Sequence, residues 1–427
     1  MARSFTPKDM QALMQLLVEQ GTGMSNISVV DTSSYISAGE LLMATGIENV
    51  FNTLNLVMGR LIIASRKHVK SLKLMQEFDN GIYTSLVRKI SFYTKMPKES
   101  GAFNTDLWTN LADGFTNGQN IGGTPPAPQS TQSMWEQNQP IPLEMNFGGS
   151  DTWQNCITMY EVQIGAAFRD ESEMAKFVAG YLQEHANDIA LQEEAWNRMC
   201  LVNKIASVSA MSAYMPSSAF DLVAGFNTRY GTSYTGTQLR TTYLKEFLAY
   251  FVSVFKLTSK YLTEKTTQYH WSVPKTINGT QYEITRETPY ADQRVYLYSP
   301  LFTEAESLVL PEIFNPQYLD INTQYQEVTF WQSIDSRAEI NVLPAITDAD
   351  PNSATYGEQI AAGSAVNLKY VVGMITDRDG LVTNMMLDRV ATTPLEARKL
   401  YRNTWQTFLK GVISDNTENV VVFYMAS

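Results

Sequence analysis

The chain has few of the residues that build metal sites and disulfide frameworks. Its 427 residues include two cysteines, Cys156 and Cys200, and three histidines. Two cysteines are too few for a disulfide framework, and we expect two buried thiols of the kind found in a reducing cytoplasm. No histidine has a second ligand at metal-binding spacing, and neither cysteine has a CxxC partner. The sequence therefore predicts no metal site and no cofactor.

Signals for secretion, membrane insertion and catalysis are also missing. The N-terminus lacks a basic segment followed by an apolar run and a small-residue cleavage site. No run of about 18 apolar residues occurs, so we expect no membrane span. There is no GxSxG motif, no P-loop and no GxGxxG opening a helix after a strand. We expect a protein that is not an enzyme and has no membrane partner.

Three polar features receive a structural interpretation. His185 lies on the apolar stripe of a predicted helix, which favours a satisfied core histidine or a subunit contact. Residues 348–352 lack the glycine and the final acid of a calcium loop, and they predict a surface loop. Residues 377–380 (Asp-Arg-Asp-Gly) follow a predicted strand, and we expect a turn held by an ion pair between segments. None of these features predicts catalysis.

Charge is distributed unevenly along the chain. The formal net charge of −11 argues against a dedicated nucleic-acid binder. Residues 60–98 nevertheless hold nine Lys or Arg and two Asp or Glu, whereas residues 99–168 hold no Lys or Arg. The basic segment is typical of a surface that faces nucleic acid on one side, and equally of a solvated helix face that pairs with neighbouring acids.

The first 90 residues predict short helices. One begins at Thr6-Pro7 and ends at Gly21, and a capping pattern at residues 37–40 opens one or two more, to about residue 66. Residues 78–90 predict a further short helix. These helices do not make a thick core alone, so we expect them to lie along another part of the protein.

A long segment at residues 95–149 is rich in Gly, Asn, Thr, Pro and Gln. Loops of this length are usually functional. Alternating apolar residues predict strands at 141–147 and 153–168, which we expect to pair as a two-stranded arm with an irregular tip. A projecting arm can bury aromatic side chains only on a partner. The candidate contacts to another subunit in this segment are Trp108, Phe115 and Trp135.

The strongest helix signal follows directly. Apolar residues keep the 3.6-residue period from Asp170 to about Ser207, on one face only, so we expect a long helix lying across a sheet with its other face polar. The remainder predicts a mixed α/β region with a second amphipathic helix at Thr237–Thr263. Asn278-Gly279 predicts a hairpin turn. Further strands are predicted at 294–298, 327–331, 338–342, 370–376, 384–390 and 419–424.

This order of elements resembles the major capsid protein of tailed bacteriophages, the fold first seen in phage Hong Kong 97. The short runs of residues at 84–90, at 401–405 and in the predicted strand at 419–424 are similar to those of capsid proteins of small podoviruses and crAss-like phages. The resemblance implies an α+β fold with an N-terminal helical arm, an extended β-loop, a long spine helix, and peripheral and axial domains. The implied divisions are 1–90 arm, 91–168 extended loop, 169–207 spine, 208–375 axial domain and 376–427 return to the peripheral domain.

The resemblance also implies partners and a location. It implies a virion subunit that assembles with itself as hexamers and pentamers around double-stranded DNA, which it contacts non-specifically, after assembly in the host bacterial cytoplasm. A separate scaffolding protein, a portal and head-decoration proteins are the other implied partners. Arg169 becomes a candidate subunit contact. The basic residues expected at the shell interior or at subunit seams are Arg66, Lys67, Lys70 and Lys73.

One departure from the family bears on how such a shell is held. The founding member cross-links its shell through a lysine on the extended loop, but residues 99–175 here contain no lysine. We therefore expect a non-covalent shell. Two alternatives stay open: another virion component, such as a tail or decoration protein, which would more often be all-β, and a carbohydrate-active protein, which should show a signal sequence and paired acids in a cleft.

Overall fold

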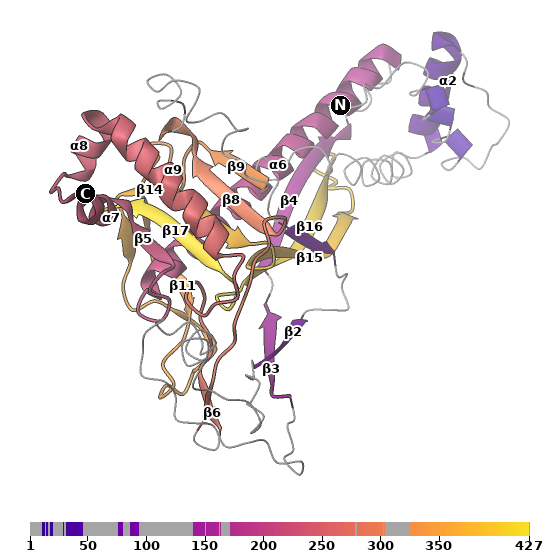
Figure 1. Ribbon diagram of the computed structural model, residues 1–427. Coiled ribbons are helices and arrows are strands. Elements are labelled where there is room, and N and C mark those ends of the chain that lie inside the picture. Colours follow the sequence, from indigo (N-terminus) through magenta and orange to yellow (C-terminus); the bar gives the residue numbers. More distant parts are fainter. Residues whose placement is uncertain are drawn as a thin grey trace.

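The structure, a computed structural model, combines two β-sheets with one long helix (Figure 1). It describes residues 31–45, 76–79, 86–93, 140–149, 151–161, 171–277, 280–301 and 324–426, with single positions 11, 12, 14, 15, 18, 19, 29, 163 and 303. Helices and strands are both present in these residues, which confirms the predicted α+β class. No helix of the described residues is long and apolar enough to cross a membrane.

The first sheet has four strands in the order β1–β15–β16–β4. β1 runs parallel to β15, and the other neighbours are antiparallel. Along β16, buried residues alternate with more exposed ones over most of its length, which is the pattern of a sheet that buries one face. The strands are β1 (Gln76–Asp79), β4 (Asp151–Tyr160), β15 (Leu381–Thr392) and β16 (Tyr401–Ser414).

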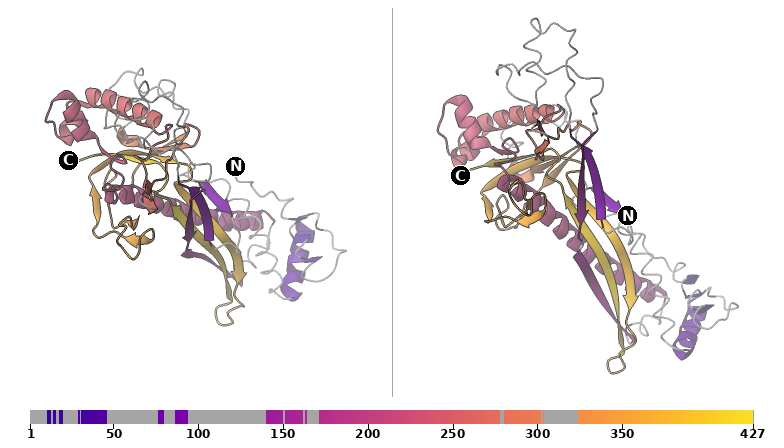
Figure 2. Two further views of the ribbon diagram at one scale, coloured as in Figure 1. Left: turned by 60° about the horizontal axis from the view of Figure 1, so that its bottom comes forward. Right: turned by 90° about the horizontal axis from the view of Figure 1, so that it is seen from below.

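The second sheet has five strands in the order β5–β17–β14–β8–β9. Nearly every side chain of β14 and β17 is buried, so both faces of this sheet are covered. Figure 2 shows α9 on one face and the C-terminal part of α6 on the other. The strands are β5 (Ala219–Asp221), β8 (Gln293–Tyr298), β9 (Gln324–Val328), β14 (Tyr370–Asp377) and β17 (Val420–Met425).

The long helix α6 (Glu171–Ala210) connects the two sheets and confirms the long helix predicted from Asp170 to about Ser207. Its 40 residues extend about 60 Å at a rise of 1.5 Å per residue. Over the four-stranded sheet it buries one stripe and leaves Leu191 72% exposed. From Cys200 to Val208 almost every side chain is buried, including the polar Lys204 and Ser207. The predicted polar face is therefore wrong for this end, because the second sheet and nearby hairpins close around it.

The predicted helix at Thr237–Thr263 is two helices. α8 (Gly236–Thr241) begins with a capping box between Thr235 and Gln238. α9 (Leu244–Tyr261) begins after Tyr243, whose backbone is not helical (φ −113°, ψ 31°). The Tyr243 ring stacks on Tyr234 with centroids 4.1 Å apart, a contact that holds the break. The other described helices are α2 (Thr32–Thr45) and α7 (Leu222–Tyr230).

Four two-stranded units complete the described fold. In β6–β7, Ile277 pairs with Thr280, so the predicted Asn278-Gly279 hairpin is confirmed. β2 and β3 form the two-stranded ribbon, defined as residues 86–93 and 141–148. The strands are β2 (Leu86–Phe92), β3 (Pro142–Gly148), β6 (Lys275–Ile277), β7 (Thr280–Tyr282), β10 (Ile340–Val342), β11 (Ala345–Thr347), β12 (Gln359–Ala361) and β13 (Val366–Leu368).

Two expectations, one about a helix near residue 80 and one about strand pairing, are wrong. Residues 78–90 do not form a helix, because β1 and β2 occupy their described parts and are stabilised by pairing with β15 and β3. The strands at 141–147 and 153–168 do not pair with each other. β3 pairs with β2, whereas β4 (Asp151–Tyr160) is an edge strand of the four-stranded sheet. Residues 381–425 contribute β15 and β16 to one sheet and β17 to the other.

Candidate functional site

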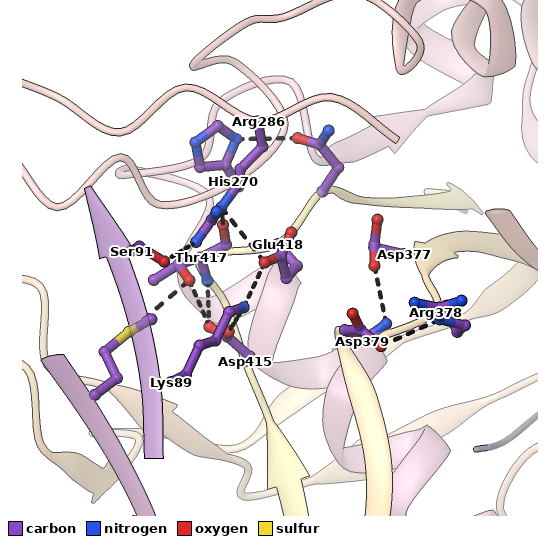
Figure 3. Close-up of polar contacts among 12 residues, drawn as sticks. Lys89, Ser91, His270, Arg286, Asp377, Arg378, Asp379, Asp415, Thr417 and Glu418 are labelled. Atoms are coloured by element: carbon purple, nitrogen blue, oxygen red, sulfur yellow. Dashed lines mark hydrogen bonds and ion pairs between the residues drawn. The ribbon is translucent and has the colours of Figure 1, made fainter. Parts of the chain in front are cut away.

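Five consecutive polar residues between β16 and β17 are buried where the two sheets meet. These residues, Asp415-Asn416-Thr417-Glu418-Asn419, are each between 0% and 8% exposed, and we call them the polar joint. Backbone bonds fix the segment, since Asp415 N donates to Gly380 O at 3.0 Å and Trp271 N donates to Asn416 O at 2.8 Å. Buried polar groups need partners, and side chains from several distant segments supply them (Figure 3).

Lys204 reaches the polar joint from α6. Its side chain is fully buried, and Nζ donates to Asp415 O at 2.8 Å and to Asn416 Oδ1 at 2.9 Å. Burial lowers the pKa of Lys204 to about 8, although the Asp415 carboxylate opposes this shift. The Asn416 amide in turn donates to Ser207 Oγ at 3.3 Å, on the same helix. The polar joint thus replaces water around the buried end of α6.

Lys89 reaches the polar joint from the two-stranded ribbon. Its ammonium group makes ion pairs with Asp415 and Glu418, whose side chains are 2% and 10% exposed. Burial alone would lower the pKa of Lys89, but the two carboxylates outweigh burial and raise it. For Asp415, burial is outweighed by Lys89 and by Thr417, so its pKa is lowered. Burial dominates at Glu418, whose pKa is raised.

Arg286 makes a second link between the ribbon and the polar joint. Its guanidinium donates to Ser91 Oγ on β2 at 2.7 Å and to Thr417 O at 3.1 Å. The same group lies 3.4 Å from Glu418 Oε1. Ser91 is next but one to Lys89 on β2, so one face of the ribbon carries both contacts. The described ribbon lies against its own body here, and the expected tip of the arm lies outside the described residues.

Hydrogen bonds connect the last residue of the polar joint, Asn419, to the turn at residues 377–380. His270 Nδ1 lies 3.0 Å from Asn419 Oδ1, and Asn419 Nδ2 donates to Thr288 Oγ1 at 3.2 Å. Thr288 Oγ1 donates to Asp377 Oδ2 at 2.8 Å, while burial raises the pKa of Asp377. Burial also lowers the pKa of His270. This chain of contacts is continuous from the ribbon to the end of β14.

The turn at 377–380 confirms the expected ion pair between segments. Arg378 lies 3.1 Å from Asp292 and 3.3 Å from Asp379. The turn borders a polar pocket of about 340 Å³, to which Asp292, Asp377, Asp379 and Glu418 contribute. Each of these four acids has an ion-pair or hydrogen-bond partner within the protein. The pocket therefore gathers several acids, but these four are engaged in holding the fold.

The outer face of the ribbon carries exposed apolar side chains beside an ion pair. Ile90 and Phe92 point away from the polar joint and are 57% and 59% exposed. Pro142 lies opposite Phe92, and Glu144 lies opposite Ile90, in the β2–β3 register. Arg88 pairs with Glu144 at 3.0 Å, with both side chains about half exposed. The outer face thus exposes two large apolar side chains, whereas the inner face is in contact with the protein's own body.

The predicted contact and basic residues lie outside the described residues. These are Trp108, Phe115, Trp135 and Arg169 in the first group, and Arg66, Lys67, Lys70 and Lys73 in the second. Two described residues of the basic segment, Arg88 and Lys89, are ion-paired on opposite faces of β2. The structure therefore leaves the arrangement of the predicted site residues untested. It assembles instead a cluster that the sequence analysis missed, because a run of five polar residues predicts an exposed turn.

The remaining sequence candidates have structural roles. His185 is 2% exposed, with Nε2 2.7 Å from Gln406 Oε1 and Nδ1 3.4 Å from Asn155, which confirms a satisfied core histidine. Cys156 and Cys200 are free thiols, and burial raises the pKa of Cys200 to about 12. Of the expected surface loop at 348–352, residues 350–352 are exposed, whereas Asp348 is buried and accepts a hydrogen bond from Thr355 at 2.7 Å. Among the described residues, no group of three His, Cys, Asp or Glu is placed to hold a metal ion.

Comparisons with known proteins give matches among solved structures alone. No family model matches the sequence, and no curated protein sequence matches it. A capsid structure of Staphylococcus phage Andhra matches with 12% identity and a TM-score of 0.49, over 83% of this chain and 84% of that chain. A structure of the head fiber and inner core protein of bacteriophage P68 matches with 10% identity and a TM-score of 0.47, over 83% of each chain.

A third match, a capsid structure of the cyanophage P-SCSP1u, has 9% identity and a TM-score of 0.40, over 84% of this chain and 88% of that chain. Each of the three matches therefore extends over most of both chains. Two of the three are phage capsid structures.

Proposed function

We propose that this chain is the major capsid subunit of a tailed bacteriophage, a structural virion protein that assembles with itself into the icosahedral head around phage DNA. The subunits would form hexamers and pentamers in the host cytoplasm, with a separate scaffolding protein, a portal and head-decoration proteins as partners. The divisions 1–90, 91–168, 169–207, 208–375 and 376–427 are proposed as arm, extended loop, spine, axial domain and return. No enzymatic activity is part of this proposal.

The observation that carries the proposal is the exposed apolar pair Ile90 and Phe92 on the outer face of the ribbon. These two side chains lie on a narrow two-stranded element whose inner face is already occupied by its own body. The two strands flank residues 94–139, a segment that carries Trp108, Phe115 and Trp135. A neighbouring copy that covered the outer face would contribute roughly 1–2 kcal/mol per apolar side chain. Repeated around a closed ring, such a contact builds a shell.

The proposed shell is held without covalent links from the loop. Residues 99–175 contain no lysine, so the loop has no amine for an isopeptide bond. The contacts proposed for the neighbour are Trp108, Phe115, Trp135 and Arg169, and Arg66, Lys67, Lys70 and Lys73 are proposed to face the interior DNA or a subunit seam. Boiled shells should run as a single monomer band in a denaturing gel, and a ladder of oligomers would contradict this part of the proposal.

The central test is assembly of the full chain. Co-expression with a candidate scaffolding protein should give closed shells by negative-stain microscopy, and the Ile90→Ser/Phe92→Ser variant should give mainly unassembled subunits. The matched control, Arg88→Ser/Asn146→Ser, changes two polar residues of the same outer face and should assemble as the parent chain does. A parent chain that stays unassembled with its scaffold would contradict the proposed function. Shells from the Ile90/Phe92 variant at parental yield would contradict the role of the ribbon.

A further inference from the structure

We propose that Lys89, together with Ser91 beside it, forms a register lock, which holds the two-stranded ribbon at one fixed position on the body of its own subunit. The inference rests on the ionic inner face of the ribbon and not on the proposed function, since it concerns a contact within one chain. Lys89 enters the polar joint between Asp415 and Glu418, and Ser91 binds Arg286 beside it. These contacts join β2 to a loop more than 300 residues away.

The inner face offers a single charged group. Among the described ribbon residues, the side chains of that face are Val87, Lys89, Ser91 and Tyr93 on β2 and Ile141, Leu143, Met145 and Phe147 on β3. Strand side chains alternate between faces, so a slip by one residue turns Arg88 or Ile90 inward. A slip by two residues keeps the face but puts Val87 or Ser91 opposite Asp415. A slip by two residues therefore leaves the buried carboxylates without the ribbon cation. A slip by one replaces Lys89 with Ile90, or with Arg88 at the cost of its pair with Glu144, and turns the apolar inner side chains to solvent.

In the observed position Lys89 completes a cluster of opposite charges. The cations that face it are Lys89, Arg286 and Lys204, and the acids are Asp415, Glu418 and Asp377, with His270 beside them and the Arg378–Asp379 pair next to Asp377. Figure 3 shows Lys89 and Arg286 with Asp415, Glu418 and Asp377, and Lys204 reaches Asp415 O from α6. Removing one partner of a buried pair is strongly unfavourable, because the remaining charge stays desolvated. Apolar contacts of Tyr93 and Leu143 also stabilise the docked ribbon, but apolar contacts are not directional and define its register less strictly.

The lock also accounts for how a two-stranded ribbon stays ordered. Two strands alone are marginally stable in water and need a surface to pack on. Amide exchange in β2 and β3 therefore reports whether the ribbon is docked. Because β14 and β17 belong to the buried second sheet, their exchange reports global unfolding and serves as an internal reference.

The test is hydrogen–deuterium exchange on the full-length subunit before assembly. Lys89→Met should raise exchange across residues 86–92 and 142–148 by roughly 10- to 100-fold while β14 and β17 stay protected. Arg88→Met is the matched control, since it removes a neighbouring cation from the outer face, and its exchange should equal that of the parent chain. Equal exchange in the Lys89→Met and parent chains would overturn the proposal.

A milder variant covers the case in which Lys89→Met fails to fold. Ser91→Ala removes the hydrogen bond from Arg286 and leaves both ion pairs of Lys89 in place. It should raise amide exchange in the ribbon a few-fold, which is the effect expected from the loss of one hydrogen bond. Exchange in β14 and β17 should not change. Unchanged ribbon exchange in Ser91→Ala, or a rise spread evenly over both sheets, would overturn the proposal. None of these readouts depends on shell formation, so they separate the lock from the proposed function.

Discussion

The two sheets of this protein are packed through different kinds of side-chain contact. The five-stranded sheet buries both faces, and aromatic rings from α9 cover Phe423 of β17. The four-stranded sheet meets α6 through ring contact, with Trp153 and Trp196 centroids 5.2 Å apart, and adds buried polar contacts, with His185 2.7 Å from Gln406 and Glu193 2.8 Å from Lys410. Apolar burial supplies most of the free energy of folding, whereas hydrogen bonds and ion pairs define direction. The comparison shows that apolar side chains pack the five-stranded sheet, whereas on the four-stranded sheet polar contacts also fix the position of α6.

The largest effect is expected in the five-stranded sheet. Phe423→Ala should lower the free energy of unfolding by about 3–5 kcal/mol, because it opens a cavity among fully buried rings. The rings of Phe220, Phe251 and Phe255 lie 6.2, 5.8 and 5.8 Å from it. Urea unfolding of the purified subunit measures this change. Trp405→Ala, on the open face of the four-stranded sheet, should lower the free energy of unfolding clearly less. Equal losses in the two variants would contradict the difference between the sheets.

A pH effect of on the order of 3 kcal/mol is expected where the two sheets meet. The folded chain holds the pKa of Lys204 near 8, below its ordinary 10.5. Between these values the unfolded chain binds a proton at Lys204 that the folded chain has released. The free energy of unfolding should therefore rise with pH from about 8 toward 10.5 through this group.

The measurement for Lys204 is a difference between variants. Urea unfolding at several pH values should show a smaller rise in Lys204→Met than in the parent chain, because titration of the other groups is common to both. The exposed Lys260→Met is the control and should keep the parental slope. Parallel pH profiles for the parent chain and Lys204→Met would show that Lys204 stays charged in its buried site.

A smaller loss is expected at the polar contact between α6 and the four-stranded sheet. Gln406→Leu removes the oxygen that accepts from His185 and should cost about 1–3 kcal/mol, since His185 is buried. Gln154→Leu, on the exposed face of the same sheet, is the matched control and should have little effect. If both variants unfold at the same urea concentration, the polar contact does not fix α6.

The smallest effect is expected on the outer face of the ribbon. Arg88 and Glu144 form an ion pair whose side chains are 60% and 46% exposed. Exposed pairs of this kind contribute about 0–1 kcal/mol, because water screens them. A double-mutant cycle with Arg88→Ala and Glu144→Ala measures the coupling directly. A coupling well above 1 kcal/mol would show that this face is more buried than its exposure indicates.

Sequence reasoning succeeded where one local pattern decides the structure. The 3.6-residue period predicted α6 almost to its ends, and the apolar run at residues 419–424 predicted β17. Asn278-Gly279 predicted its hairpin because a two-residue turn needs these residue types. The turn at 377–380 and the core role of His185 were also predicted correctly. Each of these depends on neighbours in the sequence or on simple amphipathicity.

Other features depended on partners far along the chain. Residues 76–79 become a strand because β15, some 300 residues later, offers an open edge in parallel register. The expected pairing of β3 with β4 failed because β16 binds β4 along ten residues, a longer ladder than β3 provides.

The sequence by itself determined the α+β class, the long helix and the apolar strands, since periodicity and turn chemistry are local properties. Only the tertiary structure decided which polar residues are buried and which partners they contact. Asp415-Asn416-Thr417-Glu418-Asn419 has the composition of an exposed turn, yet it is buried because Lys204, Lys89 and Arg286 arrive from three distant segments and satisfy it. A buried charge is tolerated only with its partners in place, and sequence spacing does not reveal which partners will meet.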